Sequence, residues 1–141
     1  MPHESLLAPG ADPGETLGFM SRAARTLYVW ALYLGVLGLT LLVAPNVPLR
    51  LFGVPDTHEV WLRVVGMFCV FIAALDWVAA REELTIVFRW ATYVRYTVPL
   101  FFGAFVALDL AAPQLMLFAA LDVVAATWTL LALRADARGR A

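Results

Sequence analysis

Four long apolar segments, separated by short polar or proline-rich connections, dominate the pattern of hydrophobic and polar positions along the chain. The segments cover about residues 27–44, 60–80, 85–108 and 114–133. Each is close to the roughly 20 residues that an α-helix needs to cross the hydrocarbon of a bilayer. The pattern therefore predicts an all-α fold, an integral membrane four-helix bundle that extends over residues 17–134.

The composition supports a membrane location. Of the 141 residues, 62% are hydrophobic and 15% are charged, whereas an ordinary soluble domain is about 45–50% apolar and about 25% charged. The ten basic residues are all arginines, and most lie near the ends of the apolar segments instead of forming a basic stripe. We therefore expect the lipid bilayer as the main partner and no binding of nucleic acid.

Polar residues at the two ends of the chain are predicted to lie outside the bundle. Residues 1–16 contain prolines, glycines and acids without periodic apolar spacing, which predicts a disordered tail. Apolar side chains recur at helical spacing from Leu17, so a helix is expected to begin there, at the membrane interface. Residues 135–141 are predicted to form a second, frayed polar tail.

The connections between the segments carry turn and capping signals. Prolines and a glycine in residues 45–55 prevent a long helix, and the apolar side chains between them predict a segment lying on the membrane surface. Asp56 and Glu59 have the spacing of a capping box before the second segment. The short connection at Glu82 and Glu83 makes the second and third segments antiparallel neighbours.

Small residues mark one face of each of the first two segments, where another helix backbone is expected to approach closely. On the first segment these positions, with one leucine, are Ala31, Gly35, Gly38 and Leu42, and on the second they are Gly66, Cys69, Ala73, Asp76 and Ala80. Because Asp76 shares the small-residue face, its carboxylate is predicted to face protein and not lipid.

The distribution of arginines predicts the orientation in the membrane. Arginines are enriched at the cytoplasmic ends of membrane helices. One side of the predicted bundle carries Arg22, Arg25, Arg81, Arg134, Arg138 and Arg140, and the other carries Arg50 and Arg63. Both termini are therefore expected to be cytoplasmic, in a multi-pass protein of the bacterial cytoplasmic (inner) membrane.

Four charged residues inside the apolar segments are the strongest functional signal: Asp76, Arg89, Arg95 and Asp122. At about 1.5 Å per residue, Arg95 and Asp122 lie at depths that differ by about 5 Å, which predicts an ion pair near the midplane. Asp76 is expected to pair with Arg89 or Arg95. Pairing is favoured because an unpaired charge at the bilayer centre costs roughly 2.5–3.5 kcal/mol on insertion scales.

Two interpretations of these charges remain open, with a proton relay as a third. The pairs fix which helix faces which, because hydrophobicity alone cannot order helices in lipid. Alternatively, the charges line a ligand-binding pocket with Trp77, Tyr93 and Tyr96 as its walls. The predicted function is an accessory or lipophilic-ligand-binding module, and the alternative is a proton-coupled small-molecule transporter that uses Asp76 or Asp122.

No pattern typical of a catalytic or metal site occurs in the sequence. Cys69 is the single cysteine and lies inside an apolar segment, and His3 and His58 fall on opposite sides of the predicted membrane. Nucleotide-binding glycine motifs and hydrolase motifs are also missing. We therefore predict no catalytic residues, no metal and no cofactor, and a protein that is not an enzyme.

The succession APNVPLRLFGVP, VWLRVVG, a third helix with buried arginine, and LDVVAATWTLLALR resembles uncharacterised bacterial four-span integral membrane proteins, loosely DoxX-like. It covers about residues 27–134, and its motifs are mostly apolar. DoxX-like proteins are sometimes linked to quinone-dependent oxidation complexes, and distant four-span relatives bind sterol-like molecules. The resemblance implies the fold, and it adds a quinone or another lipophilic small molecule as a candidate partner. A second copy of the chain and another membrane protein are further candidate partners.

Overall fold

The computed structural model of the chain describes residues 20–139. Within that range the chain forms five helices and no strand, which confirms the all-α prediction. The predicted tail at residues 1–16 lies outside the described residues. The helices are α2 (Arg22–Val43), α3 (Asn46–Leu51), α4 (Val60–Arg81), α5 (Thr85–Ala107) and α6 (Leu115–Arg138).

Three of the helices, α2, α4 and α6, are long and apolar enough to cross a membrane by length and composition. Helix α5 has 23 residues, which is a sufficient length, but it is not among the three. Its arginines at positions 89 and 95, together with its threonines, make it more polar than its neighbours. The predicted third segment is therefore helical, but it is more polar than the three candidate membrane-spanning helices.

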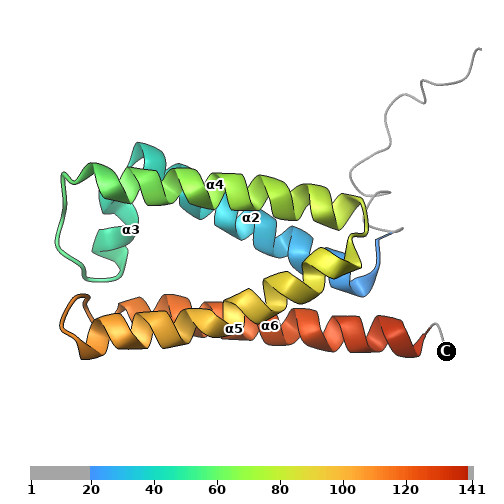
Figure 1. Cartoon of the computed structure of the whole chain (residues 1–141). Coiled ribbons are helices and arrows are strands. Elements are labelled where there is room, and N and C mark those ends of the chain that lie inside the picture. Colours follow the sequence, from blue (N-terminus) through green and yellow to red (C-terminus); the bar gives the residue numbers. More distant parts are fainter. Residues whose placement is uncertain (1–19, 140–141) are drawn as a thin grey trace, which may run out of the picture.

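The long helices are arranged as two hairpins, a first hairpin of α2 and α4 and a second hairpin of α5 and α6 (Figure 1). The hairpins meet at the end of the bundle that holds the start of α2, the α4–α5 turn and the end of α6. We call this the closed end. At the opposite end, which we call the open end, the short helix α3 lies between the diverging hairpins.

Two glycines allow the helices of the first hairpin to approach each other closely. A Cβ atom added at Gly38 would lie 2.8 Å from the carbonyl oxygen of Gly66, and one added at Gly66 would lie 2.7 Å from the carbonyl oxygen of Gly38. Gly35 faces Ala73 across the same interface. The predicted small-residue faces of α2 and α4 are thus the surfaces in contact.

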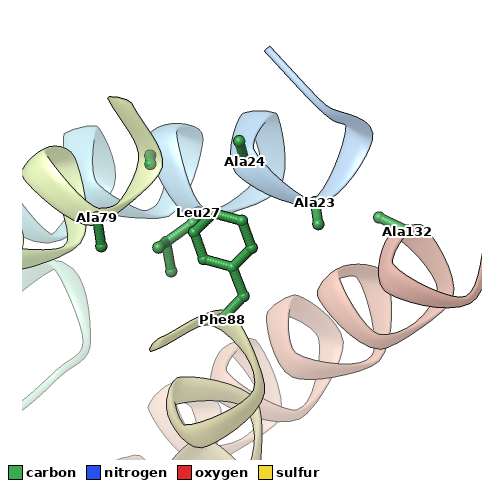
Figure 2. Packing of buried hydrophobic residues seen from close by; sticks show 7 residues of the cluster. Ala23, Ala24, Leu27, Ala79, Phe88 and Ala132 are labelled. Atoms are coloured by element: carbon green, nitrogen blue, oxygen red, sulfur yellow. The ribbon is translucent and has the colours of Figure 1, made fainter. Parts of the chain in front are cut away.

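The closed end contains the main apolar core, which is built from small residues around one large ring (Figure 2). The Phe88 ring of α5, 1% exposed, lies against Leu27 of α2. Alanines from three helices surround these two side chains, at Ala23, Ala24, Ala79, Ala80 and Ala132. The hydroxyls of Thr26 and Thr129 lie 3.0 Å apart and add a buried hydrogen bond between α2 and α6.

The first turn of α2 is capped by acids from distant parts of the chain. Asp136 of α6 accepts hydrogen bonds from the backbone N–H groups of Arg22 (3.3 Å) and Ala23 (2.9 Å). Glu83, in the α4–α5 turn, accepts one from the N–H of Ser21 at 2.6 Å. Negative side chains at a helix N-terminus satisfy its free N–H groups and its dipole. Asp136 belongs to α6, which ends at Arg138 and so continues past residue 133, the predicted end of the fourth segment.

The predicted capping box before α4 is not formed. The helix begins at Val60, with Glu59 in the N-cap position, and no side chain caps it. Asp56 instead accepts hydrogen bonds from Arg50, with the Arg50 Nε 2.9 Å from the Asp56 Oδ1. This pair is exposed, and the hydrogen bond from Arg50 holds the pKa of Asp56 below its usual value. Asp56 therefore ties the end of α3 to the segment before α4.

Candidate functional site

A buried ion pair joins the two hairpins near the middle of the bundle. The Nη2 atom of Arg95, on α5, lies 3.2 Å from the Oδ2 atom of Asp76, on α4. Both residues are buried, with exposed fractions of 5% and 6%. The prediction that Asp76 faces protein is confirmed. Of the two predicted partners, Arg89 and Arg95, it is Arg95 that pairs with Asp76.

The guanidinium of Arg95 also contacts the first helix. Its Cζ atom lies 4.4 Å from the centre of the Trp30 ring on α2, which is the geometry of a cation–π interaction. Its buried Nη1 atom has no hydrogen-bond partner among the described residues. Arg95 is therefore held between α4 and α2, and the N–H groups of its Nη1 atom are unused.

The predicted direct pair of Arg95 with Asp122 is not formed within residues 20–139. Asp122 is half-buried on α6, and its charge acts on Arg95 only at longer range than an ion-pair contact. The estimated depths gave no information on the direction in which each side chain points around its helix. Arg95 points across to the first hairpin, where Asp76 and Trp30 take up its guanidinium.

The alternative pairing of Asp76 with Arg89 is also wrong. Arg89 is exposed and forms no ion pair in the described part of the chain. It lies one turn after the start of α5 at Thr85, close to the closed end of the bundle. A long arginine side chain at that position reaches the aqueous surface, so it needs no buried carboxylate.

A cavity of about 460 Å³ lies between the two hairpins on the side of the open end. Its lining is almost entirely apolar and comes from both hairpins, α3 and the connections at the open end. The lining residues are Trp30, Tyr33, Leu34, Leu37, Leu41, Pro48, Leu49, Phe52, Val54, Leu62, Val65, Cys69, Phe102, Ala111, Ala112, Gln114, Leu115, Phe118 and Asp122.

Two polar side chains, Asp122 of α6 and Gln114 directly before α6, line the cavity. Asp122 is the only aspartate, glutamate, lysine or arginine among the lining residues, and its carboxylate makes no hydrogen bond to the described residues. Gln114 has a buried Oε1 atom that lacks a hydrogen-bond partner within the same range. The two residues are about 12 Å apart along α6, at about 1.5 Å per residue. Asp122 is the deeper of the two, because α6 starts at the open end.

The aromatic residues predicted to form the walls of a pocket, Trp77, Tyr93 and Tyr96, do not line this cavity. Trp77 packs against Tyr28, with ring centres 4.4 Å apart. Tyr93 is 54% exposed and contacts Trp90. Tyr96 shares a hydrogen bond of 2.9 Å with the hydroxyl of Thr127. None of these three predicted residues is among those that line the cavity.

The aromatic side chains that do line the cavity were missed by sequence reasoning. They come from α2, α5, α6 and the residue that follows α3, at Trp30, Tyr33, Phe52, Phe102 and Phe118. Phe52 and Phe118 contact each other, with ring centres 4.6 Å apart. The spacing of Trp30, Tyr33, Leu34, Leu37 and Leu41 along one face of α2 is the signal that indicates this wall.

No group of three or more metal-ligating side chains occurs within residues 20–139. Comparison of the chain with models of protein families, with curated proteins and with solved structures found no match. The cavity and the charged residues beside it are therefore the features that indicate a function.

Proposed function

We propose that the chain is a four-span protein of the bacterial inner membrane that binds a lipophilic small molecule in the cavity between its hairpins. The observation that carries the proposal is a cavity of about 460 Å³ with an apolar lining and a single carboxylate, that of Asp122. Ligand sites typically have volumes of about 300–1,000 Å³, apolar walls and a few polar groups that orient the ligand.

The proposed fourth span is α5. It starts at the closed end beside the start of α2, as the Glu83–Ser21 hydrogen bond indicates, and it pairs with α6 in the second hairpin. Its 23 residues have a length of about 34 Å, at about 1.5 Å per residue, which matches the hydrocarbon thickness. Asp76 neutralises Arg95, the charge deepest within it. The start of α2 and the end of α6 then lie on one side, which the arginine distribution assigns to the cytoplasm.

The nature of the cavity favours a ligand that enters from the bilayer. Apolar walls bind apolar molecules, and Asp122 and Gln114 offer two polar contacts within one cavity. A quinone or a sterol-like molecule belongs to this chemical class. The DoxX-like resemblance stays a hypothesis that is compatible with such a ligand.

The test is native mass spectrometry of the protein extracted in a mild detergent from the membranes in which it is expressed. We expect the wild-type protein to retain a lipophilic molecule. Leu37→Trp places a large ring in the cavity wall and is expected to abolish retention. The matched control is Val36→Trp on the same helix, at a position 66% exposed to the surroundings, which should leave retention unchanged.

Added ligand provides a second measurement. A ligand at about 100 times its Kd stabilises the folded protein by about 2.7 kcal/mol, which is visible as a shift of the unfolding temperature. If no lipophilic molecule is retained and none of a panel of quinones, sterols and lipids shifts the unfolding temperature, the proposal is wrong. Equal loss of binding in Leu37→Trp and Val36→Trp would also contradict it.

A second candidate function is a proton-coupled transporter that uses Asp122. The observation in its favour is a carboxylate that lines a cavity and makes no hydrogen bond to the described residues. In proteoliposomes, a transporter would accumulate the bound molecule when a pH gradient is imposed, and Asp122→Asn would not. Binding without accumulation supports the binding protein and excludes this alternative.

A further inference from the structure

The charges beside the cavity do not balance. Asp76 and Arg95 neutralise each other at 3.2 Å, and both are buried. Asp122 is a second carboxylate in the same part of the bundle, and it forms no ion pair within residues 20–139. The interior thus carries two carboxylates and one guanidinium, which leaves one negative charge in excess at the cavity surface. A charge at membrane depth is costly unless an opposite charge compensates it.

Resting on the proposed function, we infer that the ligand is a lipophilic cation whose positive group lies against the carboxylate of Asp122. The apolar part of such a molecule occupies the rest of the cavity, towards α3 and the open end. Its charge supplies the direct contact that Asp122 lacks, because Arg95 acts on Asp122 only at longer range. The ligand class is therefore an amine or a quaternary ammonium with an apolar body.

The aromatic side chains of the cavity fit the same class. Trp30 and Tyr33 line the cavity on α2, and the charge of Asp122 acts on Tyr33. Phe102 and Phe118 add rings from the second hairpin. Aromatic faces attract cations, and quaternary ammonium groups are recognised by clusters of such rings. A cavity that holds a carboxylate and is lined by aromatic rings therefore favours a cation over a neutral molecule of the same shape.

An anionic ligand fits this site poorly, although Arg95 has unused N–H groups. Arg95 is not among the residues that line the cavity, whereas the Trp30 ring, 4.4 Å from its guanidinium, is. An anion in the cavity would meet the carboxylate of Asp122 first. The repulsion between the two negative charges is strong where little water screens it.

The experiment compares three probes with the same apolar body: 1-pyrenylmethyl-trimethylammonium, 1-pyrenemethanol and 1-pyreneacetate. Binding is measured to the full chain in nanodiscs of phosphatidylcholine, and binding to empty nanodiscs is subtracted. We expect the cation to bind at least about ten times more tightly than the alcohol, and the acetate to bind least. If the alcohol or the acetate binds as tightly as the cation, the inference is wrong while the proposed function stands. If no probe binds above the empty nanodiscs, both are wrong.

Two matched variants locate the charge. Asp122→Asn keeps the shape of the side chain and is expected to weaken binding of the cation at least tenfold, with less than a threefold change for the alcohol. Asp109→Asn removes an equal charge from an exposed residue in the α5–α6 turn, and its positive φ of 55° suits asparagine. Unchanged cation binding in Asp122→Asn, or equal losses in both variants, would overturn the inference. Because the wild-type probe ranking needs no variant, it decides the matter if Asp122→Asn fails to fold.

Discussion

The closed and open ends of the bundle are formed by the same four long helices, yet the closed end holds the main apolar core and the open end contains a cavity. At the closed end, alanines around Phe88 and Leu27 let four helices converge, and Asp136 and Glu83 cap α2. At the open end, the first hairpin stays tightly packed through Gly38 and Gly66. The separation therefore occurs between the hairpins and not within them.

This difference shows what holds helices together in lipid. Lipid tails are as apolar as leucine side chains, so burying apolar surface does not by itself join two membrane helices. Contacts form where small residues permit close packing or where polar groups pair. The closed end has both, whereas at the open end bulky rings such as Phe52 and Phe118 meet across the gap between the hairpins.

The largest expected effect concerns the pair that links the hairpins beside the cavity. Arg95→Met leaves Asp76 buried without a partner, and Asp76→Leu does the same to Arg95. Each should lower the free energy of unfolding by roughly 3–5 kcal/mol, by analogy with broken buried pairs in soluble proteins. The double variant should recover much of that loss. Thermal unfolding in mild detergent provides the double-mutant cycle.

The matching cycle for Arg95 and Asp122 sharpens this prediction. Because these side chains interact only at longer range, their coupling energy should be clearly smaller than that of Arg95 with Asp76. Additive losses in the first cycle would show that Arg95 and Asp76 do not interact. A larger coupling in the second cycle would show that Arg95 is bound to Asp122 instead.

A smaller loss of unfolding free energy is expected when the large ring of the closed-end core is removed. Phe88→Ala removes the largest buried ring of the core and should destabilise the protein by about 3 kcal/mol, the lower end of the range for such changes in soluble cores, because lipid replaces water as the reference. Phe118→Ala is the control at the open end, where the ring already borders a cavity. It should cost less than half as much. Equal losses of unfolding free energy would remove the contrast between the two ends.

A still smaller loss of unfolding free energy is expected when the two helices of the first hairpin are forced apart. Gly38→Ala places a Cβ atom 2.8 Å from the carbonyl oxygen of Gly66 and should cost about 1–3 kcal/mol, as overpacked sites do. Gly103→Ala is the matched control on α5, because an added Cβ there meets no atom within 4 Å. Alanine is the better helix former, so this variant should be neutral or slightly stabilising. Chemical or thermal unfolding of both proteins tests whether the hairpin is packed through its backbone.

The smallest effect concerns the exposed Arg50–Asp56 pair at the open end. The hydrogen bond from Arg50 lowers the pKa of Asp56, so the pair contributes stability above the usual aspartate pKa, near 3.9, and that contribution is lost as the pH falls through the lowered pKa. An NMR titration of the Asp56 carboxyl should show a low pKa that rises towards the usual value in Arg50→Gln. An Asp56 pKa that is the same in both proteins would exclude the pair in solution.

The elements and one interface of this fold could be predicted from local patterns. Long apolar segments give the helices, and the small residues at Gly38, Gly66 and Ala73 mark the α2–α4 contact. The same reasoning places Asp76 towards protein. Each of these features depends on which residues share one face of a single helix. The helical period of 3.6 residues identifies such a face directly from the sequence.

The arrangement of the site could not be predicted in the same way. Depth along the helices predicts that Arg95 pairs with Asp122. The rotation of α5 about its axis instead directs Arg95 to Asp76 and Trp30. The cavity results from the angle between two hairpins, which no single helix encodes. In lipid, moreover, an apolar ring such as Phe118 fits the interior and the outer surface equally well, so hydrophobicity does not reveal which rings line a cavity.

The capping of α2 by Asp136 has a consequence for the order of assembly. The donor and acceptor of that hydrogen bond are 113 residues apart, so α2 is synthesised long before its cap exists. Chains leave the ribosome from the N-terminus at roughly 5–20 residues per second, which leaves the first turn of α2 without its carboxylate for several seconds. Helix α2 is thus synthesised early but completed late, because its first turn gains this carboxylate only when α6 arrives.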